Sequence, residues 1–142
     1  MMIAWGVVPT GPQEISIYWT ENYRHPSIRL RRGVLRADGF VSLQASVPGG
    51  ELVTRPLVFD GNQLVINYST SAAGGIRVEI QDAEGKPIPG FTLAESNLIY
   101  GDDIERVVLW KSGPAVGALS GKTVRLRLLI EDADLYSLRF RP

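Results

Sequence analysis

The sequence alternates apolar and charged residues at Ile76-Arg77-Val78-Glu79-Ile80, and it repeats this pattern at Val124-Arg125-Leu126-Arg127-Leu128. A period of two residues is typical of a β-strand with one face in a core and the other toward solvent. These two stretches therefore predict a sheet whose inner face is aliphatic and whose outer face carries charges.

Other stretches of the chain carry strand signals of the same kind. They are residues 14–20, 40–44, 64–68, 107–110 and 135–140. Turn clusters such as Pro48-Gly49-Gly50 and Ala73-Gly74-Gly75 separate the segments, and no segment keeps a helical period. Strands without intervening helices pair antiparallel. We therefore expect an all-β fold, an antiparallel β-sandwich of jelly-roll type, because the strands outnumber a minimal seven-strand set.

The length of 142 residues fits one domain, which we expect to span residues 1–142. Within it, residues 1–37 end in an arginine-rich strand, Ile28 to Arg36, before the turn Asp38-Gly39. This segment could be an N-terminal junction, with residues 38–142 as the sandwich proper.

Composition excludes several classes of function. Fifteen basic residues balance fifteen acidic ones, and the densest basic stretch would divide its arginines between two faces of a strand, so we expect no nucleic-acid binding. The chain has no cysteine, which excludes disulfides and thiolate metal sites. It has no stretch of about 20 apolar residues, so we expect no membrane partner.

Catalytic motifs are missing or incomplete. Gly121-Lys122-Thr123 resembles the end of a phosphate-binding loop, but the first glycine of that motif is absent and a strand follows. His25 is the only histidine, and no nucleophile elbow accompanies it. Asp102-Asp103 fits a polar turn better than a glycosidase carboxylate pair. We expect the chain not to be an enzyme.

One acidic motif suggests a metal. Asp132 and Asp134 lie at alternate positions beside a strand start, where two carboxylates could share a structural calcium ion. Asp38 could be a third ligand if the first and last strands of the sandwich pair. The alternative is a polar turn without a metal.

Aromatic residues near loops are the candidates for binding sugars, because flat rings stack on the apolar faces of sugar rings. The candidate carbohydrate-binding residues are Trp19, Tyr23, Tyr100, Asp102 and Trp110. For each aromatic taken singly, packing in the core or at a sheet edge is the alternative.

Several stretches together resemble a known family of proteins. They are residues 5–10, 14–18, 30–32, 36–42, 64–68, 76–82, 101–110, 124–127 and 134–140. The pattern resembles the C-terminal region of bacterial proteins related to five-bladed β-propeller glycoside hydrolases of the levanase and arabinanase-like groups, in which a β-sandwich follows the propeller. The resemblance implies a catalytic propeller as partner domain, with residues 1–37 at its end or junction. It carries over no catalytic residue, because the propeller that would hold the catalytic carboxylates is absent here.

Two functions follow as hypotheses. The first is a non-catalytic carbohydrate-binding module that holds a glycoside hydrolase near a polysaccharide or oligosaccharide. The alternative is a structural accessory sandwich that stabilises the propeller and binds no glycan. Either role implies an extracellular or periplasmic parent protein, although residues 1–6 do not resemble a signal peptide.

Overall fold

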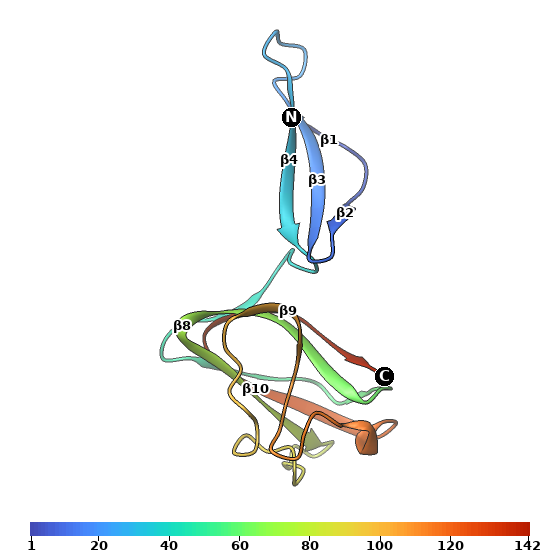
Figure 1. Cartoon of the computed structure of the whole chain (residues 1–142), viewed down its shortest axis with the longest axis vertical. Coiled ribbons are helices and arrows are strands. Elements are labelled where there is room, and N and C mark those ends of the chain that lie inside the picture. Colours follow the sequence, from blue (N-terminus) through green and yellow to red (C-terminus); the bar gives the residue numbers. More distant parts are fainter. The chain divides into compact units, whose positions relative to one another are not determined.

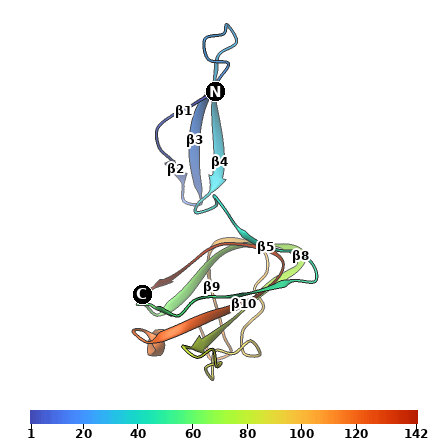
Figure 2. The same cartoon turned by 180° about the vertical axis from the view of Figure 1, so that it is seen from behind.

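The computed structural model describes all residues from Met1 to Pro142. The fold is all-β with antiparallel pairing throughout, as predicted, and the one helical element is the short 3₁₀ turn η1 (Gly117–Leu119). The chain divides into two compact units, Met1–Phe40 (unit 1) and Val41–Pro142 (unit 2), shown in Figures 1 and 2. Unit 1 thus extends a few residues beyond the expected junction segment 1–37.

Unit 1 is a four-stranded sheet arranged around one central strand. Strand β3 (Glu14–Glu21) pairs along its whole length with β4 (Arg29–Arg36), close to the arginine-rich strand expected there. The short strands β1 (Met2–Ile3) and β2 (Val8–Gly11) also pair with β3. They therefore share its other edge, and β4 is left as a free edge of the sheet.

Unit 2 is built on two long strands that form one antiparallel ribbon. Strand β8 (Gln63–Asp82) has 20 residues and β10 (Thr123–Arg141) has 19, and they pair from end to end. Strand β9 (Asp102–Val107) pairs with β8. Strands β5 (Leu43–Ala45), β6 (Gly50–Val53) and β7 (Leu57–Val58) pair with the other edge of β10. Every strand of unit 2 is therefore attached to this ribbon.

The ribbon bends near its middle, so that its two halves face each other (Figure 1). The register shifts on β10 between Glu131 and Ala133, where Asp132 has a left-handed φ of 42°. On β8, a Cβ atom at Gly74 would overlap the carbonyl oxygen of Asp132. Glycine is therefore required at residue 74, because the two strands approach each other there more closely than a side chain allows.

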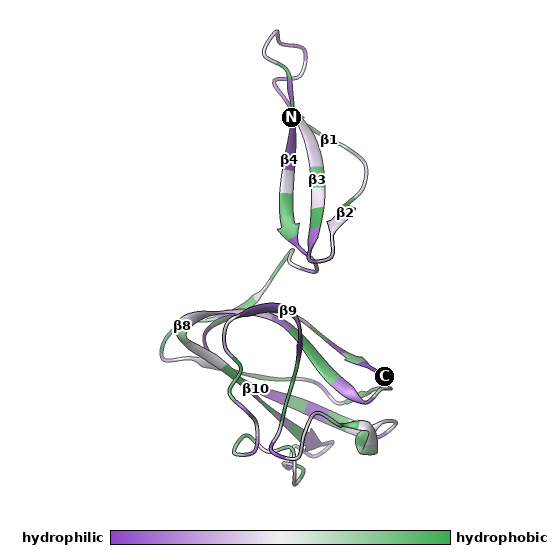
Figure 3. Cartoon of the chain, in the orientation of Figure 1, coloured by the Kyte–Doolittle hydropathy of each residue, from purple (hydrophilic) through white to green (hydrophobic).

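The core of unit 2 lies between the two halves of the ribbon. Alternate residues of β8 and β10 point inward and are almost fully buried, among them Leu64, Ile66, Ile76, Val78, Ile80, Leu126 and Leu128. The neighbours between them in Ile76–Ile80 and Val124–Leu128 are charged, so the two faces differ as the alternation predicted; Figure 3 shows this hydropathy along the strands. Phe59 closes one end by stacking on Phe140, with ring centroids 3.8 Å apart.

Replacing Leu128 by alanine tests this core. Leu128 is fully buried and pairs with Val78, so Leu128→Ala should lower the free energy of unfolding by about 2–5 kcal/mol. Urea denaturation followed by circular dichroism measures the change. Val58→Ala is the control, because Val58 is 62% exposed, and its change should stay within about 0.5 kcal/mol. Equal losses in the two variants would contradict the assignment of the core.

Candidate functional site

Trp19 and Tyr23, two of the predicted sugar-binding residues, line one hollow in unit 1. The hollow has a volume of about 230 Å³, and its other lining residues are Met2, Ile3, Ala4, Thr20 and Leu30. Its wall is therefore mostly apolar, with two aromatic rings among the lining groups.

Trp19 owes its position to a glycine on the neighbouring strand. Trp19 is on β3, and a Cβ atom at Gly33 of β4 would lie only 2.7 Å from its ring. The absence of a side chain at Gly33 therefore lets the indole lie over β4. The ring stays partly exposed rather than buried.

Tyr23 lies in the loop that joins β3 to β4. Its side chain is half exposed, and the Arg24 guanidinium lies 5.6 Å from the centre of its ring. Asn22 and Arg24 both have left-handed φ angles, which turn the chain sharply after β3. In the same loop the side chain of His25 bonds only Ser27, whose Oγ atom lies 2.7 Å from Nδ1, while the His25 N–H donates to the Asn22 carbonyl.

Tyr100 and Asp102 belong to unit 2, whereas the hollow that Trp19 and Tyr23 line belongs to unit 1. Tyr100 is 69% exposed, and its backbone carbonyl accepts a hydrogen bond of 2.8 Å from the hydroxyl of Tyr68. Asp102 is exposed at the start of β9, opposite Ser69. Burial raises the pKa of the Tyr68 hydroxyl, which remains a donor to this turn.

Trp110 does not belong to any exposed surface, which corrects its assignment as a sugar-binding residue. It is 2% exposed, its indole N–H donates to the Val78 carbonyl at 2.9 Å, and Phe91 meets its ring edge-on at 5.3 Å. The indole has apolar partners for its ring and a carbonyl for its N–H. It is therefore a core residue with no face available to a sugar.

The three aspartates predicted as calcium ligands are not brought together. No group of three or more acidic or histidine side chains is arranged to hold a metal ion. Asp38 is in unit 1, whereas Asp132 and Asp134 are in unit 2. Asp134 instead accepts a hydrogen bond of 2.6 Å from the Ser42 hydroxyl, and Asp132 occupies the bulge of β10. The polar-turn alternative describes them better.

A second hollow in unit 2 was not predicted. It has a volume of about 510 Å³ and lies over the outer face of β6, β10 and β8, where Glu51, Arg77 and Glu131 meet its rim. These residues come from three strands that are distant in sequence. The only feature of the sequence that indicated this hollow was the alternation that points residue 77 away from the core.

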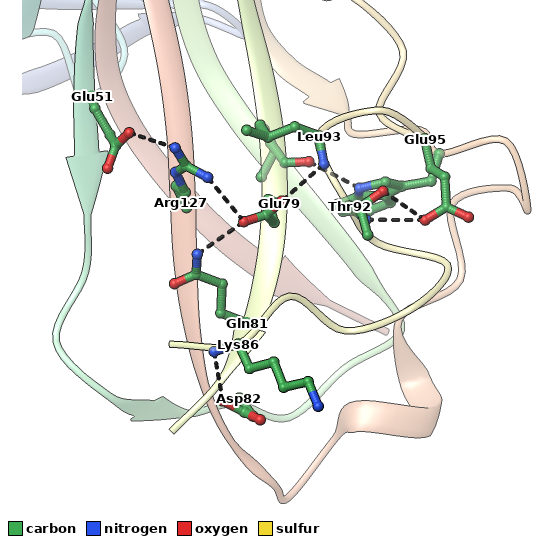
Figure 4. A network of polar contacts seen from close by, with 11 residues as sticks. Glu51, Glu79, Gln81, Asp82, Lys86, Thr92, Leu93, Glu95 and Arg127 are labelled. Atoms are coloured by element: carbon green, nitrogen blue, oxygen red, sulfur yellow. Dashed lines mark hydrogen bonds and ion pairs between the residues drawn. The ribbon is translucent and has the colours of Figure 1, made fainter. Parts of the chain in front are cut away.

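Beside this hollow, a polar network fixes the outer face of the sheet (Figure 4). Glu79 is 3% exposed and accepts hydrogen bonds from Gln81 Nε2 at 2.9 Å and from the Leu93 N–H at 3.1 Å. Arg127 lies 3.4 Å from Glu79 and 2.8 Å from Glu51. The bond to Glu51 raises the pKa of Arg127, so this guanidinium joins the carboxylates of β8 and β6 across β10.

Glu95 organises the loop that runs beside β8. Its Oε2 atom accepts hydrogen bonds from the Thr92 hydroxyl at 2.8 Å, the Thr92 N–H at 3.2 Å and the Gly90 N–H at 3.0 Å. These bonds favour the charged form, so the pKa of Glu95 is lowered below 4.5, with the Thr92 hydroxyl as the largest cause.

Comparisons with known proteins do not place the chain in a family. No family model, no curated protein and no solved structure matches it. No helix in the structure has the length and apolar character that crossing a membrane requires.

Thr92→Val should raise the pKa of Glu95 toward 4.5, because it removes the hydrogen bond that lowers this pKa most. A lowered pKa means that Glu95 stabilises the fold above pH 4.5 and that this contribution is lost as the pH falls through its folded pKa. Carbon-detected NMR titration of the carboxyl group measures the midpoint. Ser112→Ala is the control, because Ser112 bonds the Gly90 carbonyl and not Glu95. An unchanged midpoint in Thr92→Val would refute the assigned cause.

Proposed function

We propose that this chain is a non-catalytic accessory module of a propeller-type glycoside hydrolase, and that unit 1 packs against the propeller. One observation carries the proposal: unit 1 has no fully buried apolar side chain. Within Met1–Phe40, Ser16 is the only residue in the buried class. A sheet without a core of its own needs a surface to cover it.

Apolar side chains occupy both faces of the unit 1 sheet. Ile3 pairs with Trp19 and so shares its face, whereas Leu30 and Val34 pair with Thr20 and Ser16 on the other face. Ile3 is 70% exposed, Leu30 68% and Val34 50%. Exposed apolar groups on both faces of one sheet are typical of a layer that lies between two others.

The size of unit 1 supports the same conclusion. Chains shorter than about 40 residues rarely bury enough apolar surface to fold alone, and they rely on disulfides, metals or association. Unit 1 is Met1–Phe40, and the chain has no cysteine. Association with a larger domain is therefore the stabilisation that this unit needs.

The choice of a propeller as the partner rests on the resemblance of the sequence to propeller glycosidases. Propeller blades are four-stranded antiparallel sheets that pack face to face around a channel. Unit 1 also has four antiparallel strands with exposed apolar side chains, although β1 and β2 share one edge of β3, so the sheet is three strands wide. In this proposal, unit 2 is a sandwich of jelly-roll type beside the propeller, and the parent enzyme acts on polysaccharide outside the cytoplasm.

Glycan binding by the module itself is the second candidate function. The observation that favours it is the hollow that brings Trp19 and Tyr23 together in an apolar wall. Exposed Tyr100 beside Asp102 would offer a separate contact on unit 2. The two candidates differ in what covers Trp19: a protein surface in the first and a sugar ring in the second.

Hydrogen exchange tests the docking proposal. In the chain alone, amides of β3 and β4 should exchange much faster than those of β8 and β10, because unit 1 has no core. Adding the separately expressed propeller domain should slow the exchange of the β3 and β4 amides. Leu30→Asp should weaken the association at least tenfold, whereas Val58→Asp, an exposed change in unit 2, should not. Strong protection of β3 in the chain alone, with no effect of the propeller, would overturn the proposal.

Retention on polysaccharide tests the second candidate. The chain is applied to a panel of insoluble polysaccharides and to soluble glycans in affinity electrophoresis. Trp19→Ala should abolish retention if a sugar stacks on the indole, and Tyr23→Ala should weaken it about tenfold. The control is Tyr18→Ala, the next aromatic on β3, which does not line the hollow. Equal retention of all variants would exclude this hollow as the glycan site.

A further inference from the structure

The hollow of unit 2 is built on one cross-strand row of the sheet. Leu129 on β10 pairs with Glu51 on β6 and with Arg77 on β8. Side chains that are direct cross-strand partners share one face of a sheet. An apolar side chain is therefore flanked by a carboxylate and a guanidinium, whose strands lie about 10 Å apart, two strand spacings.

Glycines create the space above this row. Gly75 pairs with Glu131, so one position of the next row has no side chain. A Cβ atom at Gly75 would lie 2.6 Å from Leu98 Cδ1, and Leu98 therefore forms a wall of the hollow. Gly49 and Gly50 also line the hollow, so part of its wall is backbone.

The polar groups at the rim are held in place and still have bonding capacity. Arg77 uses Nη1 to bond the Ser96 carbonyl at 2.5 Å, and its other N–H groups form no hydrogen bond within the chain. Glu51 is held by Arg127 at 2.8 Å. The Glu131 carboxylate forms no hydrogen bond or ion pair within the chain. The hydrogen-bond donors of Arg77 therefore lie on the β8 side of the hollow, and the carboxylate acceptors of Glu51 and Glu131 lie on the β6 and β10 sides.

The donors, acceptors and apolar side chains that line the hollow indicate which class of ligand it could bind. Two carboxylates disfavour an anion, and no grouping of three acidic side chains is present for a metal cation. Sugar hydroxyls both donate and accept hydrogen bonds, so they can donate to Glu131 and accept from Arg77, while the apolar face of the ring packs on Leu129 and Leu98. The volume of about 510 Å³ is in the range of small-molecule sites.

We infer that this hollow binds a short neutral oligosaccharide. The class of ligand agrees with the glycan-binding candidate, on which this inference rests, but the site is separate from Trp19 and Tyr23 and from the surface proposed to dock on the propeller. It would place a glycan site on unit 2, where the sequence had suggested only Tyr100 and Asp102 as accessible contacts.

NMR titration of the whole chain tests the inference. Neutral oligosaccharides of the fructan, arabinan, xylan and glucan series are added at millimolar concentration, and backbone amide shifts are followed. One series should move the amides of Gly49, Gly75 and Leu98. Arg77→Met should weaken that binding about tenfold, and Glu131→Gln, an exposed change that preserves the fold, should weaken it several-fold. Arg125→Met is the matched control, because Arg125 is on the same face but bonds the Ala83 carbonyl outside the hollow.

Three outcomes would overturn the site. They are no shift at the hollow with any series, shifts that Arg77→Met and Glu131→Gln leave unchanged, and shifts confined to residues around Trp19 and Tyr23. The last outcome would retain glycan binding as a function while removing this hollow from it. Docking of unit 1 is measured separately by hydrogen exchange, so its failure is distinguishable from the failure of this site.

Discussion

The antiparallel pairing of β8 with β10 is the interaction on which unit 2 depends. The two strands supply most of the buried side chains, and β5, β6, β7 and β9 all pair with one of them. Because the ribbon bends, the inner face of one half packs on the inner face of the other. The bulge at Asp132 and the close approach at Gly74 are therefore what convert a flat ribbon into a fold with two layers.

Much of this fold could be predicted from local sequence, because alternation alone determines which side chains face a core. The stretches 64–68, 76–80, 124–128 and 135–140 all lie in strands, and burial alternates along 124–128 as expected, whereas every residue of 64–68 is buried. Their continuity could not be predicted. Ala73-Gly74-Gly75 is typical of a turn between two strands, yet it lies inside β8. Pairing with β10 is interrupted between Thr70 and Gly75, where the Ala73 and Gly74 N–H groups bond Ser71 Oγ, and it continues on both sides of the bend. Whether residues 73–75 form a turn or a bend within one strand depends on their contact with β10, and no local feature of the sequence indicates that contact.

The candidate sites divide in the same way. Trp19 and Tyr23 meet because they are close in sequence, on either side of one strand end. Trp110 is close to exposed loops in sequence, but its burial depends on Val78 and Phe91, which belong to distant segments. The row of Glu51, Leu129 and Arg77 requires the register of three strands, and the assignment of Asp38 to a different compact unit from Asp132 and Asp134 requires the contacts of the whole chain. The place of a residue along its own strand could be predicted from the sequence, whereas its neighbours on other strands could not.

The end-to-end ribbon also has a kinetic consequence. Gln63 at the start of β8 bonds Arg141 near the end of β10, although the two residues are 78 positions apart in the sequence. Most contacts of the chain join residues that are far apart in the sequence, and closing the intervening loops costs entropy before these contacts form. Unit 2 must therefore cross a high entropic barrier to fold. Its unfolding is constrained by the same arrangement: β8 and β10 run through both layers, so neither layer can detach while the other stays intact.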